Sequence, residues 1–346
     1  MSTEAVGIEV AGAPELPGLR FRRYEGEADL PALQRVLEAQ VRADGEPEES
    51  VSLEALLALF ADPLGWEPAR DVLIAEQDGQ IVAWSRIQYQ WFETEDAFRS
   101  RGYVLPAARG RGLGRAMLRR NEADLLRLAA EVPTRGKPRW LQGWVTERMP
   151  AAAAVFEAAG YETFHFYFEM ERPVELPLPE EAAERSGSAA AVLARPTAGD
   201  MRAMVGLLAD AFRGHWGHYQ MSEADIESET RRMLDDPSTE LDLCRVSRDG
   251  ERIVGVLRAT YDAATRSGAI EELGTHPGHR GRGIGSALLA SALDGLRDRG
   301  AELVRLGVDA EDRFGALGLY ERFGFRVAKR GIGYRKAIPL PGRDAA

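Results

Sequence analysis

The chain has 346 residues, of which 45% are hydrophobic and 29% are charged, and its formal net charge is −11. This composition is that of a folded globular protein, and the length suggests two domains rather than one. The acidic balance argues against nucleic acid as a main partner. No apolar run approaches a membrane span and no signal peptide is visible, so we expect a cytoplasmic protein with no membrane partner.

The first half predicts, in chain order, a strand at 19–24, helices at 28–41 and 53–60, a hairpin of strands at 72–76 and 80–90, and a strand at 98–105. A helix then begins at Leu113, followed by a strand at 139–145, a helix at 149–159 and a closing strand at 161–170. The second half repeats this order from residue 192 to residue 336. We therefore expect a duplicated domain at 18–172 and 191–337, joined by a linker at 173–190 that is rich in proline and glutamate.

One short motif occurs in both halves. Residues 104–114 read VLPAARGRGLG and residues 275–285 read THPGHRGRGIG, so a proline, two arginines and three glycines keep the same relative positions. Glycines at alternate positions let backbone N–H groups point toward one centre, and the helix that follows adds its positive dipole end. The pattern predicts a turn that holds a pyrophosphate. A flexible, solvated basic loop remains the alternative.

Two better-known phosphate motifs do not match. The dinucleotide fingerprint needs Gly-x-Gly-x-x-Gly, and a Walker loop needs Gly-Lys-Ser/Thr; neither copy has them. The turn instead resembles the acetyl-CoA loop of the GNAT acetyltransferases, Arg/Gln-x-x-Gly-x-Gly/Ala, with Arg280, Gly283 and Gly285 in place. The stretch 319–325, Leu-Tyr-Glu-Arg-Phe-Gly-Phe, resembles a later motif of that family.

The resemblance covers both halves and implies two tandem acyl-CoA N-acyltransferase domains. Each would be an α/β (α+β) domain with a mixed, mostly antiparallel sheet, splayed central strands and flanking helices. It also implies acetyl-CoA as the donor. The residues that would bind it are Leu273, Gly274, Thr275, Arg280, Gly281, Arg282, Gly283, Ile284, Gly285, Ser286 and Asp312 in the second half, and Tyr103, Val104, Leu105, Arg109, Gly110, Arg111, Gly112, Leu113, Gly114 and Arg115 in the first.

Acetyl transfer to an amine needs a base, a hydrogen-bond donor for the oxyanion and a proton for the leaving thiolate. The resemblance assigns the last role to Tyr320, which could otherwise be a core residue, and the donor role to the backbone near Leu273. Glu271 and Glu272 lie on the strand that enters the turn. Because side chains alternate on a strand, we expect only one of them to face the cleft as the base. A solvated strand charge is the alternative.

The first half lacks these groups. Aligned on the shared proline, Ser100 and Arg101 stand opposite the two glutamates, and Phe156 stands opposite Tyr320. We therefore expect the second domain to be catalytic, while the first binds acetyl-CoA or once did. The predicted function is transfer of an acetyl group to a small-molecule amine in a ternary complex. The alternative is a non-catalytic acetyl-CoA sensor, and the oligomeric state, a pseudo-dimeric monomer or a homodimer, stays open.

Other reactive side chains predict no further chemistry. Cys244 is the only cysteine, which excludes an internal disulfide, and we expect a buried structural thiol. His215 and His218 have no evident third ligand, so no metal site is expected. With Trp216 and Tyr219 they form either a packing corner or, by the resemblance, the border of the acceptor pocket.

Overall fold

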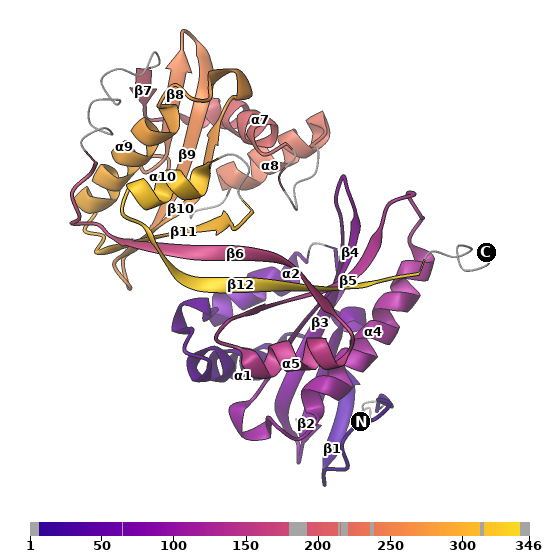
Figure 1. Cartoon of the computed structure of the whole chain (residues 1–346). Coiled ribbons are helices and arrows are strands. Elements are labelled where there is room, and N and C mark those ends of the chain that lie inside the picture. The colour runs from indigo at the N-terminus through magenta and orange to yellow at the C-terminus, as the bar shows by residue number, and fades with distance from the viewer. Residues whose placement is uncertain are drawn as a thin grey trace. The chain divides into compact units, whose positions relative to one another are not determined.

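The computed structural model describes residues 7–63, 65–179, 192–213, 215, 221–235, 239–311 and 315–339. The chain forms two compact units (Figure 1). The first unit comprises Met1–His165 with Gly331–Ala346, and the second comprises Phe166–Arg330. In the described ranges no helix is long and apolar enough to cross a membrane.

The first unit contains a sheet in the order β1-β2-β3-β4-β5-β12. Its strands are β1 (Leu19–Arg23), β2 (Val72–Gln77), β3 (Gln80–Trp91), β4 (Asp96–Val104), β5 (Arg139–Thr146) and the second half of β12 (Arg326–Ala337). Its α-helices are α1 (Leu30–Ala43), α2 (Leu53–Ala61), α3 (Pro68–Asp71), α4 (Leu113–Glu131) and α5 (Pro150–Ala158). The β2–β3 hairpin turns at Asp78 and Gly79, both with positive φ, as an Asp-Gly pair predicts.

The second unit repeats this plan in the order β7-β8-β9-β10-β11-β6. Its strands are β7 (Val192–Ala194), β8 (Arg245–Asp249), β9 (Arg252–Asp262), β10 (Ser267–Thr275), β11 (Leu303–Asp309) and most of β6 (Glu162–Pro173). Its described α-helices are α7 (Met201–Ala211), α8 (Glu223–Asp235), α9 (Ile284–Asp298) and α10 (Ala316–Arg322). The predicted duplication is therefore confirmed at the level of element order.

Each sheet is antiparallel except for one central parallel pair, and that pair splays apart. In the second unit β10 pairs with β11 from Ser267 to Ile270 only, although β10 continues to Thr275. In the first unit β4 pairs with β5 from Asp96 to Arg99 only. The mixed sheet with splayed central strands, expected from the family resemblance, is confirmed in both units.

The last strand of each sequence half completes the sheet of the other half. Gly331–Ala337 of β12 pairs with β5, and β6 pairs with β11 from Tyr167 to Pro173. In Figure 1 the yellow β12 accordingly lies beside magenta β5. The boundaries expected from the sequence, 18–172 and 191–337, do not include this exchange. Both closing segments have the pattern of a sheet strand, and that pattern does not say which sheet a strand joins.

Side chains from the exchanged strands fill both cores. In the first unit Tyr334 is 3% exposed and donates to Glu157 Oε1 at 2.8 Å. In the second unit Met170 is fully buried among residues of α9, α10 and β11. Arg172 is also fully buried, and its Nε donates to the carbonyl of Phe323, the C-cap of α10, at 2.6 Å. The strand from the first sequence half thus fixes the end of the helix that carries Tyr320.

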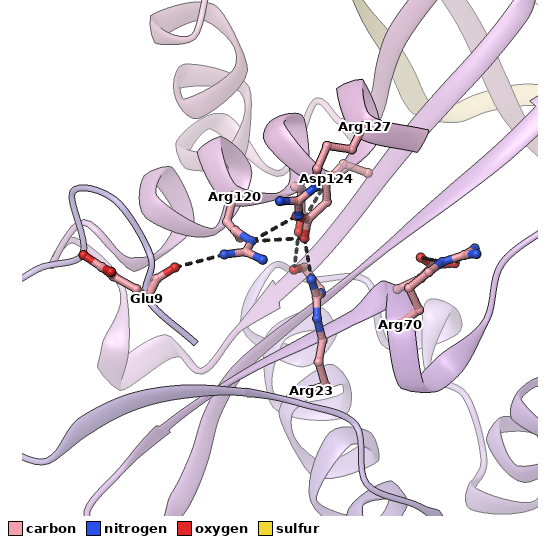
Figure 2. Close-up of polar contacts among 10 residues, drawn as sticks. Glu9, Arg23, Arg70, Arg120, Asp124 and Arg127 are labelled. Atoms are coloured by element: carbon pink, nitrogen blue, oxygen red, sulfur yellow. Dashed lines mark hydrogen bonds and ion pairs between the residues drawn. The ribbon is translucent and has the colours of Figure 1, made fainter. Parts of the chain in front are cut away.

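A charged cluster ties α4 to the edge of the first sheet. Asp124, whose side chain is 5% exposed, accepts from Arg23 of β1 at 2.6 Å and from Arg120 at 3.0 Å, and it also pairs with Arg127 (Figure 2). Arg120 further donates to the carbonyl of Glu9 at 3.0 Å. The buried carboxylate of Asp124 therefore joins β1 to α4, and Arg120 links α4 to the N-terminal segment.

Candidate functional site

The two glycine-rich turns have the same backbone conformation. Gly281 and Gly283 have φ of 75° and 80°, and Gly283 is the N-cap of α9. Gly110 and Gly112 have φ of 74° and 90°, and Gly112 caps α4. These left-handed positions suit glycine and aim the following N–H groups out of the helix end. Both turns fit a phosphate group, since α4 and α9 are long helices with a positive end at this point.

Backbone amides of β10 face the splay in the second unit. His276 N–H donates to Val254 of β9 at 2.9 Å. Because amides alternate along a strand, the N–H groups of Thr275 and Leu273 point to the opposite edge, from which β11 has diverged. Donors on an opened strand edge fit the amide-containing arm of acetyl-CoA. Of the expected positions, Leu273 and Thr275 therefore direct their N–H groups into the splay, while Arg280 of the turn that follows donates to the carbonyl of Ala211 at 2.7 Å.

The first unit fills the corresponding positions with its own side chains. Val104 N–H, which faces the splay, donates to Gln40 Oε1 of α1 at 2.8 Å. Arg109 forms a bidentate pair with Asp44, with distances of 2.5 and 2.8 Å. Counted from the helix start, Gln40 corresponds to Ala211 of α7, whose methyl group cannot accept a hydrogen bond. Two groups that would hold acetyl-CoA are thus already bound internally in the first unit.

The two glutamates of β10 lie on one face of the sheet. The β9 partner of Ile270 is Ala259 and that of Glu272 is Arg258, so Glu271 is the extra residue of a β-bulge. Glu271 Oε1 accepts from Thr260 Oγ1 at 3.0 Å, and Glu272 Oε2 pairs with Arg258 Nη1. Thr260 and Arg258 are alternate residues of β9 and share a face. The expected alternation of these two side chains was wrong, because the bulge brings both glutamates to one face of the sheet.

The first unit has arginines at this place. Strand β4 pairs with β3 without a bulge, so Arg101 is the counterpart of Glu272, and Glu271 has none. Arg101 lies opposite Arg86, over the rings of Tyr103 and Trp66 respectively. Burial lowers the pKa of Arg86, and the neighbouring charge of Arg101 acts in the same direction. This face of the first unit contains like charges where the second contains an ion pair.

Ser100, which the sequence alignment set against Glu271, points the other way. Its hydroxyl accepts from Asn121 of α4 at 2.8 Å, and Asn121 in turn accepts from Ser85 at 3.1 Å. All three side chains are buried. Ser100 therefore belongs to the packing between sheet and α4, on the face away from α1.

Tyr320 lies on α10 and is 6% exposed, with its ring 5.9 Å from that of Phe325. Its counterpart Phe156 stacks on Tyr334 at 5.6 Å. Tyr320 thus belongs to the buried core of the second unit, together with Leu306 of β11 and Leu288 of α9. When the two helices are aligned, α10 has a hydroxyl group at Tyr320 where α5 has none, at Phe156, and this hydroxyl is the predicted proton donor.

The remaining candidates give no second site. Cys244 is buried, and burial raises the pKa of its thiol, as expected for a structural cysteine. His215 lies 5.2 Å from the ring of Phe212. Within the described part of the chain, no group of three potential ligands could hold a metal ion. Asp312, Trp216, His218 and Tyr219 lie outside the described residues.

Sequence reasoning missed the partners of the candidate site residues. Thr260 and Arg258 lie on β9, and Gln40 and Asp44 come from α1. Their residue types gave no signal on their own. Only the register of β9 with β10, shifted by the bulge, shows which side chains the two glutamates meet.

Comparison with known proteins agrees with the geometry of both units. A model of the acetyltransferase (GNAT) family matches residues 201–325, and a model of the acetyltransferase (GNAT) domain matches residues 68–163. Mycothiol acetyltransferase of Clavibacter sepedonicus is 33% identical over 235 residues, 68% of this chain and 71% of that protein.

Solved structures show the same architecture. A GCN5-related N-acetyltransferase from Sphaerobacter thermophilus matches with a TM-score of 0.72 and 25% identity, covering 94% of this chain and 98% of that one. A tandem GNAT protein from the clavulanic acid biosynthesis pathway matches in fold, with a TM-score of 0.63 and 16% identity over 93% of this chain and 99% of that one. The chain belongs to the GNAT acetyltransferase family and is an acetyl-CoA-dependent N-acetyltransferase with two GNAT domains in tandem.

Proposed function

We propose that the second unit alone transfers the acetyl group of acetyl-CoA to a primary amine of a small molecule. The observation that carries this proposal is the difference between the two splays. The second unit has strand amides at its splay, a pair of carboxylates on β10 next to it, and Tyr320 in a core that also contains Leu306 of β11. The first unit has arginines on that face, bonds its strand amide to Gln40 of α1 and pairs Arg109 with the carboxylate of Asp44. Arg280 of the second unit donates instead to the backbone carbonyl of Ala211.

The proposed reaction is direct transfer in a ternary complex. A carboxylate of β10 takes a proton from the acceptor ammonium, and the neutral nitrogen attacks the thioester carbon. The backbone N–H groups of Leu273 and Thr275 stabilise the oxyanion while the C–N bond forms. The C–S bond then breaks, Tyr320 protonates the sulfur, and the proton that the acylated nitrogen loses restores the Tyr320 phenol. The products are the N-acetylated acceptor, free CoA and one proton released to solvent.

A covalent acetyl-enzyme is disfavoured by the position of the only cysteine. Cys244 is 2% exposed, and burial raises the pKa of its thiol. A nucleophilic cysteine needs a thiolate in reach of the substrate. Direct attack by the amine needs no cysteine thiolate.

For the first unit we propose a supporting role. Its closing strand β12 begins in the second unit, and it supplies β6 in return. An anion that entered the turn at 109–114 would have to displace Asp44 from Arg109. We therefore propose one acetyl-CoA per chain, bound in the second unit.

Two measurements on the full chain test the proposal. Titration calorimetry should give one acetyl-CoA per chain. Release of free thiol should then rise when acetyl-CoA is incubated with the right member of an amine panel. That panel should include the unacetylated precursor of mycothiol, the compound for which the relatives are named, with amino sugars, polyamines and amino-acid amides.

The outcomes separate the proposal from its alternative. Two molecules of acetyl-CoA bound per chain would contradict the proposal that the first unit does not bind the donor. Tight binding of one acetyl-CoA without acetylation of any amine would instead favour a sensor, the non-catalytic function that the same turn could serve.

A further inference from the structure

The bulge of β10 gives the second unit two adjacent carboxylates with different partners. Glu271 is inserted between the pairs Ile270–Ala259 and Glu272–Arg258, immediately after the last pairing of β10 with β11. Both side chains lie on the face covered by α7, since the backbone of Gly274, two residues after Glu272, approaches Leu208 and Ala211. The two carboxylates therefore lie where the strands begin to diverge.

Glu272 is held by a cation. Its Oε2 pairs with Arg258 Nη1, and the two side chains are 33% and 19% exposed. The pair is also the first cross-strand pair after the bulge. In such an ion pair one carboxylate oxygen already accepts a hydrogen bond, and the guanidinium neutralises the negative charge. The Glu272–Arg258 ion pair is therefore suited to stabilising the backbone of the bulge.

Glu271 is held only by a hydroxyl. Its Oε1 accepts from Thr260 Oγ1 at 3.0 Å, and the side chain is exposed. Among the described residues it forms no ion pair, and none of them bonds its Oε2. A hydroxyl donor fixes the direction of the carboxylate without matching its charge, which leaves the second oxygen to meet an incoming ammonium.

We infer that Glu271 is the catalytic base and that Thr260 is its positioning residue, while Glu272 and Arg258 anchor the bulge. This inference rests on the proposed function and names which carboxylate performs its proton transfer. Glu271 Oε2 accepts one proton from the acceptor ammonium and becomes a carboxylic acid, and the amine keeps the electron pair that attacks the thioester. The proton then passes to solvent.

The first unit supports the inference because its strand β4 has no bulge and no counterpart of Glu271. Its β4 has no inserted residue, and Ile87, Arg86 and Arg101 occupy the register of Ala259, Arg258 and Glu272. The exposed carboxylate is therefore present only where the strand gained one residue. The insertion, rather than the ion-paired position, distinguishes the unit proposed to be active.

Four variants of the full chain test the inference: E271Q, E272Q, T260V and T260S. Each would be assayed for kcat and KM with the best amine, for acetyl-CoA affinity by calorimetry, and for thermal unfolding. E271Q should lower kcat by about 100-fold or more, the usual contribution of a general base, with the acetyl-CoA Kd within about twofold of wild type. E272Q should lower the unfolding temperature and reduce kcat by less than E271Q does.

The threonine pair separates positioning from packing. T260V keeps the shape of the side chain but removes the hydroxyl, and should lower kcat by about 10-fold with the KM for acetyl-CoA unchanged. T260S restores the hydroxyl and should recover most of that loss. A serine variant as impaired as the valine variant would overturn the positioning role.

The assignment of the base has its own decisive result. A larger loss of kcat in E272Q than in E271Q, with both variants folded and binding acetyl-CoA, would overturn it while leaving the acetyltransferase function intact. A wild-type chain that acetylates no amine would overturn the proposed function and this inference together.

Discussion

Tyr320 and Phe156 differ by one hydroxyl at matched positions of α10 and α5. Replacing Tyr320 with Phe should lower kcat by about 100-fold, because the leaving thiolate would lose its proton donor. Acetyl-CoA binding should persist, because the ring that packs near Phe325 is kept. Steady-state kinetics with calorimetry would check this outcome.

Tyr334 offers a matched control for that variant. It is also a buried tyrosine, with its hydroxyl donating to Glu157 at 2.8 Å in the first unit. Tyr334→Phe should leave kcat unchanged and lower stability by about 1 kcal/mol, the usual effect of one lost hydrogen bond. Equal loss of kcat in the two variants would show that the Tyr320 effect is only structural.

At the scale of elements, the two turns provide a direct comparison. Arg282 and Arg111 are exposed, at matched positions just before the helix N-caps. Arg282→Glu should raise the KM for acetyl-CoA by about 10-fold or more, since a charge-assisted hydrogen bond contributes roughly 1.5–3 kcal/mol. Arg111→Glu should change it by less than about twofold. Steady-state titration of acetyl-CoA would show the difference, and equal effects would mean that both turns bind the donor.

Helix α4 depends on Asp124 for its attachment to β1. Asp124→Asn keeps the size of the side chain but leaves Arg23 and Arg120 without a counter-charge at this position (Figure 2). We expect a loss of about 2–3 kcal/mol, less than for a fully buried pair because the guanidiniums are partly exposed. Arg127→Ala removes the most exposed partner and should cost under about 1 kcal/mol. Urea unfolding would measure both, and similar losses would contradict the central role of the carboxylate.

At the scale of the whole molecule, the exchanged strands make each unit depend on the far end of the chain. A chain that ends at Arg330 would lack the β12 segment that covers β5 and would lose Tyr334 and Ile338 from the first core. The first unit should unfold at lower urea, while acetyl-CoA binding by the second persists. Hydrogen exchange mapped along the chain would resolve the two units. Uniform loss of protection in both would contradict this view.

Different parts of this architecture were predictable to different degrees. Repeated local chemistry, such as the two glycine-rich turns that open a helix and the hairpin at 78–79, follows from short patterns and was recognised. The strand exchange and the capping of Val104 by Gln40 depend on contacts between distant residues, which periodicity does not encode. The bulge at Glu271 was missed because two consecutive glutamates look the same in a regular strand and in a bulged one.

Because β6 and β12 are exchanged between the two sheets, cutting the chain between β6 and β7 would not yield two complete domains. The N-terminal fragment would carry Phe166–Pro173, which belongs to the second sheet, and the C-terminal fragment would carry Gly331–Ala337, which belongs to the first. Neither fragment would own a complete sheet, and each would hold the piece that the other lacks. Each fragment would therefore need the strand carried by the other to complete its own sheet, and we expect the two fragments to fold only when they are combined.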